Sequence, residues 1–273
     1  MKILIGRIGC RGDVLVASAI MPALKKKFPE SQIYFLTEFP ASLKGNQYLY
    51  KPLKLNNYKE CEPYDLILNL DDVYELRPET SMLQAFSDLA QVPIEDCELF
   101  LQCDPFDIPE NYIVFHVGKT NWAGRNWHVD KFNQIGRRLK NLDYNIVCVG
   151  DQEDNCIECD VDLRNKTNVW ELATLIKNAK LFVGIDSFPM HVSQAVKTHG
   201  VCFFGSVKPE LRIIGSYIKG VIAKNLDCLG CHHRQKAPCS FTETCETGTL
   251  NCEHFVTEEE FFKEVVGKLH ESS

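Results

Sequence analysis

Short apolar runs alternate with amphipathic helical repeats along the whole chain. Continuous apolar runs predict buried strands, and they fall at residues 1–6, 31–38, 64–72, 112–118, 144–150, 180–186 and 200–206. Apolar residues at helical spacing predict helices between them, at 14–28, near 80–90, and at 132–142, 168–179 and 189–196. A last amphipathic helix is expected from residue 257 to the end. Strands that alternate with helices are typical of an α/β protein with mostly parallel sheets.

The strand–helix alternation occurs twice, with a stretch rich in prolines and acids (104–111) between the halves. A chain of 273 residues is long for one compact core. We therefore expect an N-terminal domain over 1–105, a C-terminal domain over 106–256 and a separate final helix over 257–273. Capping-box spacing marks the starts of the helices at Asn168/Glu171 and Thr257/Glu260.

Composition and charge narrow the classes of function. Hydrophobic residues make up 45% and charged residues 25%, as in ordinary globular proteins. The net charge of -7 argues against a general nucleic-acid binder but leaves room for a local basic pocket that binds an anion. Arg7 and Arg11 interrupt the first apolar segment, so no signal peptide is expected. No run approaches the roughly 20 apolar residues of a membrane span, and we expect a cytoplasmic protein.

The first strand end with unusual chemistry is "GRIGCRGD", residues 6–13. Ligands of parallel sheets bind at the carboxyl ends of strands. Gly6, Gly9 and Gly12 loosely resemble a dinucleotide-binding fingerprint. Asp13 stands at the start of the next helix. It is either a helix-start residue that stabilises the dipole or a carboxylate aimed into a cleft.

A second polar loop, "HVGKTNWAGRNW" at 116–127, directly follows a predicted strand. Lys119, Thr120 and Arg125 offer two cations and a hydroxyl to a phosphate, with two tryptophans nearby. The alternative is a solvated loop whose tryptophans fill a domain edge.

A third stretch, "VGIDSFPMH" at 183–191, carries Asp186 and Ser187 to the start of a short helix. A helix N-terminus can bind phosphate. The alternative is an ordinary helix cap, with His191 packed under the loop. A hydrolase triad fits poorly, because no nucleophile-elbow sequence surrounds Ser187.

Five of the 13 cysteines crowd into residues 228–252. In a reducing compartment, scattered cysteines mostly behave as small buried hydrophobes. Cys228-x2-Cys231 can present two thiolates to one metal, and a tetrahedral site needs four ligands. The alternatives are unligated thiols or a regulatory disulfide. The expected ligand set is Cys228, Cys231, Cys245 and Cys252, with Cys239 in reserve and His232 and His233 less favoured. Thiolates favour zinc or iron, and four of them leave no open position, so the ion would be structural.

Three stretches, in this order, resemble motifs of glycosyltransferase family 9, the ADP-heptose heptosyltransferase-like enzymes. These are the opening strand, glycine turn, Gly-Asp pair and helix (1–29), "GRNWHVDKFNQIGRRL" (124–139) and "VGIDSFPMHVSQAV" (183–196). The final helix fits a fourth family feature. The resemblance implies the GT-B architecture: two Rossmann-like domains that face a cleft, with the C-terminal helix crossing back to the first domain.

The resemblance also implies an activity. A family member would be an inverting enzyme that moves a sugar, a heptose in this family, from an ADP-sugar to a saccharide or protein hydroxyl. Asp13 matches the acceptor-side carboxylate that acts as general base, and Arg125 matches the contact to the donor pyrophosphate. The donor-binding residues implied are Lys119, Thr120, Arg125, Glu153, Asp186, Ser187 and His191. No catalytic metal is expected, and some protein-glycosylating relatives carry a comparable metal-binding cysteine finger.

The sequence departs from the family at two points. Phe188 stands where the family usually has glycine, and the first half is short. A short acceptor domain fits an open site for a bulky acceptor, or a loss of activity.

Two rival functions remain at this point. An NAD-dependent oxidoreductase would use the glycines of 6–12, with Glu38 on a ribose. Its catalytic Tyr50-x3-Lys54 pair has Pro52 between the two residues, which disfavours a helix. The other rival is a non-catalytic module that binds a sugar nucleotide or a protein.

Overall fold

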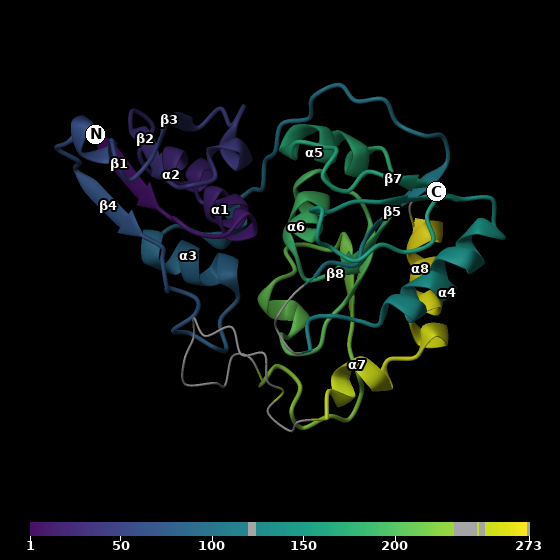
Figure 1. The fold of residues 1–273 in the computed structure, drawn as a ribbon. Helices are drawn as coiled ribbons and strands as arrows, with labels where there is room; N and C mark the ends of the chain where they lie inside the picture. The colour runs from purple at the N-terminus through teal and green to yellow at the C-terminus, as the bar shows by residue number, and fades with distance from the viewer. Residues whose placement is uncertain (120–123, 232–244, 246–248, 272–273) are drawn as a thin grey trace. The chain divides into compact units, whose positions relative to one another are not determined.

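The computed structural model describes residues 1–119, 124–231, 245 and 249–271. Residues that lie close together in space form two compact units, residues 1–102 and 103–273. Both units are α/β, and every strand pairing is parallel (Figure 1). The predicted fold class of two parallel βα halves is confirmed.

The first unit has a four-stranded sheet in the order β3-β2-β1-β4. Its strands are β1 (Lys2–Gly6), β2 (Gln32–Leu36), β3 (Leu49–Leu53) and β4 (Leu66–Asn69). Its helices are α1 (Arg11–Ser18), α2 (Met21–Lys27) and α3 (Met82–Ala90). The single helix predicted over 14–28 is divided between α1 and α2.

The edge strand β3 escaped prediction because most of its residues are exposed and it contains Pro52. An edge strand tolerates proline, since one side of its backbone has no ladder to join. Tyr50 lies in this strand and Lys54 follows it. The catalytic helix that the oxidoreductase alternative requires is therefore not formed there.

The second unit has a six-stranded sheet in the order β10-β9-β8-β5-β6-β7. Its strands are β5 (Tyr112–His116), β6 (Asn145–Cys148), β7 (Val161–Asp162), β8 (Leu181–Ile185), β9 (Gly200–Phe203) and β10 (Ile218–Val221). The four strands predicted in this half are present. β7 and β10 lie at the two edges and lack a long apolar run, which is why the sequence pattern missed them.

The helices of the second unit are α4 (Val129–Lys140), α5 (Val169–Lys177), α6 (Phe188–Ala195), α7 (Asn251–Phe255) and α8 (Glu258–Glu271). They include the four that were predicted, and α7 is an addition. Asn168 and Glu171 form the predicted capping box. Thr257 and Glu260 exchange the same two hydrogen bonds, each 3.2 Å long. In the part of the chain that is described, every helix is too short or too polar to traverse a bilayer.

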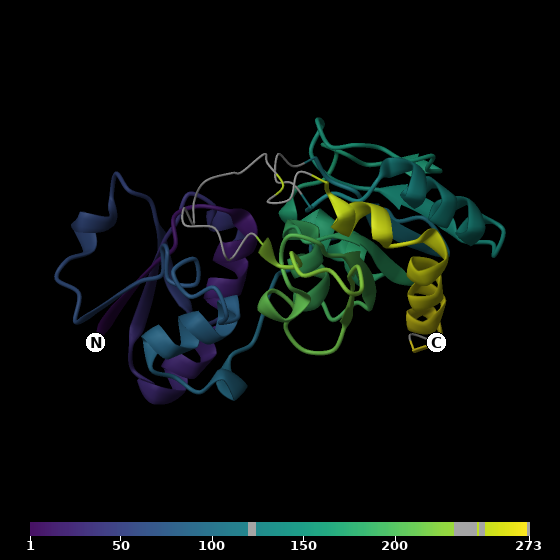
Figure 2. The same ribbon diagram turned by 90° about the horizontal axis from the view of Figure 1, so that it is seen from below.

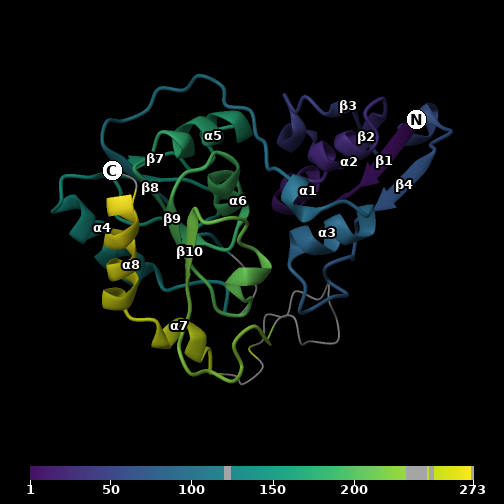
Figure 3. The same cartoon turned by 180° about the vertical axis from the view of Figure 1, so that it is seen from behind.

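The C-terminal helix α8 packs on the second sheet. Phe261, Val265 and Leu269, spaced four residues apart, bury one face of α8 in the core of this unit. Figures 2 and 3 show α8 beside α4 and along β8–β10, and contacts join these elements. Residues 258–271 are thus part of the core of the second unit, and the crossing of this helix to the first domain stays a prediction.

Trp127 is the centre of that core. Its ring stacks on Phe261 at 4.5 Å between centroids and meets Phe132 edge-on at 5.0 Å. Its indole N–H donates to the carbonyl of Val256 at 3.3 Å. Trp127 therefore has the packing role that the sequence offered as the alternative for the tryptophans of this loop.

Replacing Phe261 by alanine should destabilise the second unit by about 3–5 kcal/mol, since it removes a fully buried ring. Trp122, Trp127 and Trp170 all fall in residues 103–273, so tryptophan fluorescence during urea unfolding follows this unit. Phe255→Ala is the matched control, because Phe255 is 54% exposed and its loss should change stability by less than about 0.5 kcal/mol. Equal effects of the two variants would contradict this packing.

Candidate functional site

At the carboxyl end of β1, Asp13 belongs to a buried ion-pair network. Arg7 follows β1 directly, and its guanidinium donates to Oδ2 of Asp13 and to Oε1 of Glu75, the latter at 2.6 Å. The hydroxyl of Tyr74 donates to the same Oδ2 at 2.9 Å. Burial lowers the pKa of Arg7, but the nearby negative charges of Asp13 and Glu75 outweigh burial, so the net shift is upward. Arg7 therefore stays charged and fixes the orientation of Asp13.

Asp13 lies in the first turn of α1 and is mostly buried, with 13% of its side chain exposed. Cys10, not a glycine, takes the left-handed conformation at the turn, with φ 60°. Within the described residues, both hydrogen bonds to Asp13 end on Oδ2, which leaves Oδ1 to accept a proton. The geometry favours a carboxylate held for chemistry over a dinucleotide cradle. The sequence had not singled out Arg7, Tyr74 and Glu75 as its partners.

In the second unit, two arginines lie beside Asp186 just before the start of α6. Arg125 donates through Nε to the carbonyl of Asp186 at 2.7 Å, and its guanidinium lies 3.5 Å from Oδ2 of the same residue. The buried Arg212 lies 3.9 Å from that oxygen. Two arginines thus face one carboxylate next to the positive end of a helix. Arg212 was not predicted, since no local motif surrounds it.

A hydrogen-bonded chain links three loops at the same sheet edge. Ser187 Oγ lies 2.9 Å from Nδ1 of His116, and Nε2 of His116 lies 3.2 Å from Oδ2 of Asp154. Asp154 also accepts from the backbone N–H of Lys119 at 2.8 Å. Burial raises the pKa of Asp154, but the hydrogen bonds from His116 and from backbone amides outweigh it and lower the pKa. An ionised Asp154 only accepts, so Nε2 of His116 carries the hydrogen that it shares.

Because Ser187 is engaged with His116 and with the carbonyl of Ile185, its hydroxyl does not cap α6. Gly150 makes the close approach of Asp154 feasible. Its φ is +141°, and a Cβ there would lie 3.1 Å from the His116 ring. His116 ends a predicted strand and Asp154 lies in the predicted loop 150–154, but only the fold shows that they meet.

The other predicted donor contacts are spread around this edge. Lys119 Nζ pairs with Oε2 of Glu153 at 3.0 Å, and both side chains are more than half exposed. His191 is buried, and its Nδ1 lies 3.2 Å from Nε2 of Gln194. Phe188 is the first residue of α6 and is partly exposed. Thr120 lies outside the described residues.

The cysteine cluster lies against the loop that carries Arg125. Burial raises the pKa of the Cys252 thiol to about 12, and the nearby negative charges of Glu253, Cys231, Cys245 and Cys228 add to the rise. Cys228, Cys231 and Cys245 are thus near enough to Cys252 to act electrostatically on its thiol. The N–H of Leu250 donates to Sγ of Cys245 at 3.4 Å, and Gly230 turns the Cys228–Cys231 segment with φ +73°. Cys239, His232 and His233 lie outside the described residues.

Cys252 and Glu253 connect this cluster to the Arg125 loop. The backbone N–H of Gly124 donates to Oε1 of Glu253 at 2.8 Å. A Cβ on Gly124 would lie 3.0 Å from Sγ of Cys252. The loop that carries Gly124 thus lies close to Sγ of Cys252 and is hydrogen-bonded to Glu253.

Similarities to known proteins agree with this geometry. Residues 80–249, more than half of the chain, match the model of "Glycosyltransferase family 9 (heptosyltransferase)". Lipopolysaccharide heptosyltransferase 3 of Escherichia coli K12 is 29% identical over 135 residues, which are 44% of this chain and 39% of that protein. The match therefore spans about two fifths of that relative's length.

Solved structures share the fold over nearly the whole chain. The iron-containing dodecameric glycosyltransferase TibC of enterotoxigenic E. coli aligns with a TM-score of 0.79 and 15% identity, over 99% of this chain and 76% of TibC. The ADP-heptose LPS heptosyltransferase II of E. coli aligns with a TM-score of 0.73 and 14% identity, over 99% of each chain. These likenesses establish a GT-B fold, and with the family match they show that the chain belongs to glycosyltransferase family 9.

Proposed function

We propose that this protein transfers a heptose from ADP-heptose to a hydroxyl group, with inversion at the anomeric carbon. The observation that carries the proposal is the pair of arginines, Arg125 and Arg212, beside the start of α6. The Ser187 hydroxyl is turned away from the first amides of that helix. Two cations and helix amides suit the diphosphate of a nucleotide sugar.

The choice of ADP-heptose is supported by relatives. The curated relative is a lipopolysaccharide heptosyltransferase, and TibC has been solved in complex with ADP-D-β-D-heptose. We extend that donor to this chain because the residues that face α6 fit its diphosphate. Lys119 and Glu153 are placed on the exposed rim of the same sheet edge, where a nucleoside can reach them.

On the donor side, the residues act by charge and position. As the bond between the anomeric carbon and the diphosphate oxygen breaks, its electron pair passes to that oxygen. Arg125 and the α6 amides stabilise the negative charge that develops on ADP. The chain Ser187–His116–Asp154 holds the loops that surround the diphosphate in one arrangement.

On the acceptor side, Asp13 serves as the general base. Its Oδ1 accepts the proton of the acceptor hydroxyl while the hydroxyl oxygen attacks the anomeric carbon. A single displacement of this kind inverts the configuration at that carbon. Arg7 and Tyr74 hold the carboxylate in place by hydrogen bonds. We propose a saccharide or a protein side chain as the acceptor.

We further propose that Cys228, Cys231, Cys245 and Cys252 hold a structural zinc or iron ion. The proposal is supported by the Cys-x2-Cys spacing of Cys228 and Cys231 and by the N–H···S bond to Cys245. When bound, the ion would hold the Arg125 loop through Cys252. None of the twelve described cysteines forms a disulfide. We propose a cytoplasmic location, as expected from the sequence.

Asp13→Asn should reduce heptose transfer by about 100- to 10,000-fold, because the amide cannot accept the hydroxyl proton. Radiolabelled ADP-heptose incubated with a bacterial extract measures transfer, and calorimetry measures donor affinity, which should not change. Glu75→Gln removes the same charge from Arg7 without touching the reacting hydroxyl, so it should cost less than about tenfold. A non-catalytic binding protein would instead show ADP-heptose binding without transfer in the wild type.

Arg125→Ala should weaken ADP binding by roughly 10- to 100-fold, the range expected for the loss of a charge-assisted hydrogen bond to a phosphate. Titration calorimetry with ADP gives the affinity directly. Arg137→Ala is the matched control, because Arg137 pairs with Glu158 on the exposed face of α4. If Arg125→Ala leaves the ADP affinity unchanged, the diphosphate does not bind at this end of the sheet.

Replacing Cys228 and Cys231 together by serine should remove one metal ion per chain and lower the fluorescence-detected Tm by at least about 5 °C. Elemental analysis of protein purified without oxygen gives the ion and its amount. Cys61→Ser with Cys97→Ser, two partly buried thiols of the first unit, is the control and should change neither value. The same metal content in both double variants would rule out the cysteine finger.

A further inference from the structure

A second group of cysteines lies between β6 and β7, apart from the cluster at 228–252. Cys148 is the last residue of β6, and Asp162 is its direct partner across the parallel pairing with β7. Cys156 and Cys159 lie in the connecting loop, with the spacing Cys-x2-Cys. Three thiols and one carboxylate thus come from one loop and the two strands that it joins.

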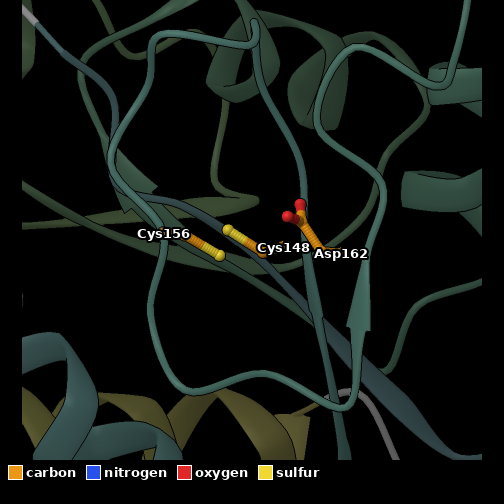
Figure 4. Close-up of side chains that lie close together, drawn as sticks. All are labelled: Cys148, Cys156 and Asp162. Carbon is orange, nitrogen blue, oxygen red and sulfur yellow. The ribbon is translucent and has the colours of Figure 1, made fainter.

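Three of the four ligand atoms of this group converge, and the fourth, from Cys159, lies beside Cys156. The sulfur atoms of Cys148 and Cys156 and a carboxylate oxygen of Asp162 all lie within 4.8 Å of one another, and Figure 4 shows the two sulfur atoms side by side. The sulfur of Cys159 lies 3.8 Å from that of Cys156. Two thiolates bonded to one tetrahedral Zn²⁺ at about 2.3 Å are separated by roughly the same distance. A disulfide would require about 2.05 Å.

The surroundings of Asp162 suit a ligand. Arg164 donates to both of its oxygens, at 3.0 and 2.8 Å, and so fixes the plane of the carboxylate. A carboxylate has about four lone-pair positions, so these bonds leave capacity for a metal. The Arg164 side chain also donates to the carbonyl of Asp154 at 2.5 Å. Hydrogen bonds of this type orient metal ligands in proteins.

We propose that Cys148, Cys156, Cys159 and Asp162 form a second, structural site for a tetrahedral thiolate-binding metal ion, for which Zn²⁺ is the best match. Three sulfur ligands and one oxygen ligand complete a four-coordinate shell with no open position. The thiols lose their protons when the ion binds, and the ion is bound as a divalent cation without any change of oxidation state. The inference does not depend on the proposed transferase activity.

The site would fix the loop 149–160 to the edge of the sheet. That loop carries Asp154, which binds His116 and the backbone of Lys119. Arg164 connects Asp162 to Asp154 directly. The ion would therefore set the position of the Asp154–His116–Ser187 chain, and, under the proposed function, the position of the donor.

Metal counting can separate the two cysteine sites. Three double variants are purified without oxygen, loaded with Zn²⁺ and dialysed: Cys156→Ser with Cys159→Ser, Cys228→Ser with Cys231→Ser, and the control Cys61→Ser with Cys97→Ser. We expect two zinc ions per chain in the wild type and in the control, and one in each of the other two. If the cysteines of 228–252 bind no metal but the second site does, the wild type should hold one zinc ion and the 156/159 variant none.

Thiol protection tests the site in the wild-type chain, where no variant can misfold. Zn²⁺ should slow alkylation of Cys156 and Cys159 by at least about tenfold, as read by mass spectrometry of the peptide that contains them, and should leave Cys61 and Cys97 unaffected. The proposal is overturned if the 156/159 variant binds as much zinc as the wild type. It is equally overturned if Zn²⁺ does not protect these thiols, or if they are found joined as a disulfide.

Discussion

The parallel pairing of β5 with both β6 and β8 is the constraint on which the donor-side site depends. In this register His116, the last residue of β5, lies opposite Gly184, so the segment after β8 begins beside the His116 ring. A side chain at position 184 would meet the His116 carbonyl at 2.7 Å, and glycine removes that clash. The carboxyl ends of three neighbouring strands then deliver His116, Ser187 and Asp154 to one edge. No single loop could hold this arrangement alone.

The two halves of the proposed chemistry differ in their electrostatics, and each is set by buried charge. Around Asp13, one arginine is surrounded by several carboxylates, which suits a neutral hydroxyl that must give up a proton. Around Asp186, two arginines surround one carboxylate, which suits a diphosphate. Buried ion pairs of this kind are costly to form and stabilise little. Their presence in both units is better explained by the positions that they impose on Asp13 and Arg125.

Much of this arrangement could be read from the sequence, because long apolar runs identify strands and the residues that follow a strand lie at the ligand edge. Asp13 and Asp186 were found in that way, and the resemblance to the family gave them roles. The partners were missed, since Glu75 and Arg212 come from distant segments with no motif of their own. The sheet against which α8 packs could not be read from the sequence either. The apolar spacing of this helix shows that one face is buried, but spacing alone does not say which sheet covers it.

Both proposed metal sites lie beside a loop at the carboxyl edge of the second sheet. The described parts of these loops contain glycines at positive φ, Gly118 and Gly124 after β5 and Gly150 after β6. Each loop is adjacent to a set of cysteines that includes one buried sulfur, Cys252 for the first and Cys148 for the second. A metal crosslink needs only four side chains and restricts both ends of a loop at once. If both proposed sites hold a metal, the two groups of cysteines position the loops that face the donor under the proposed function.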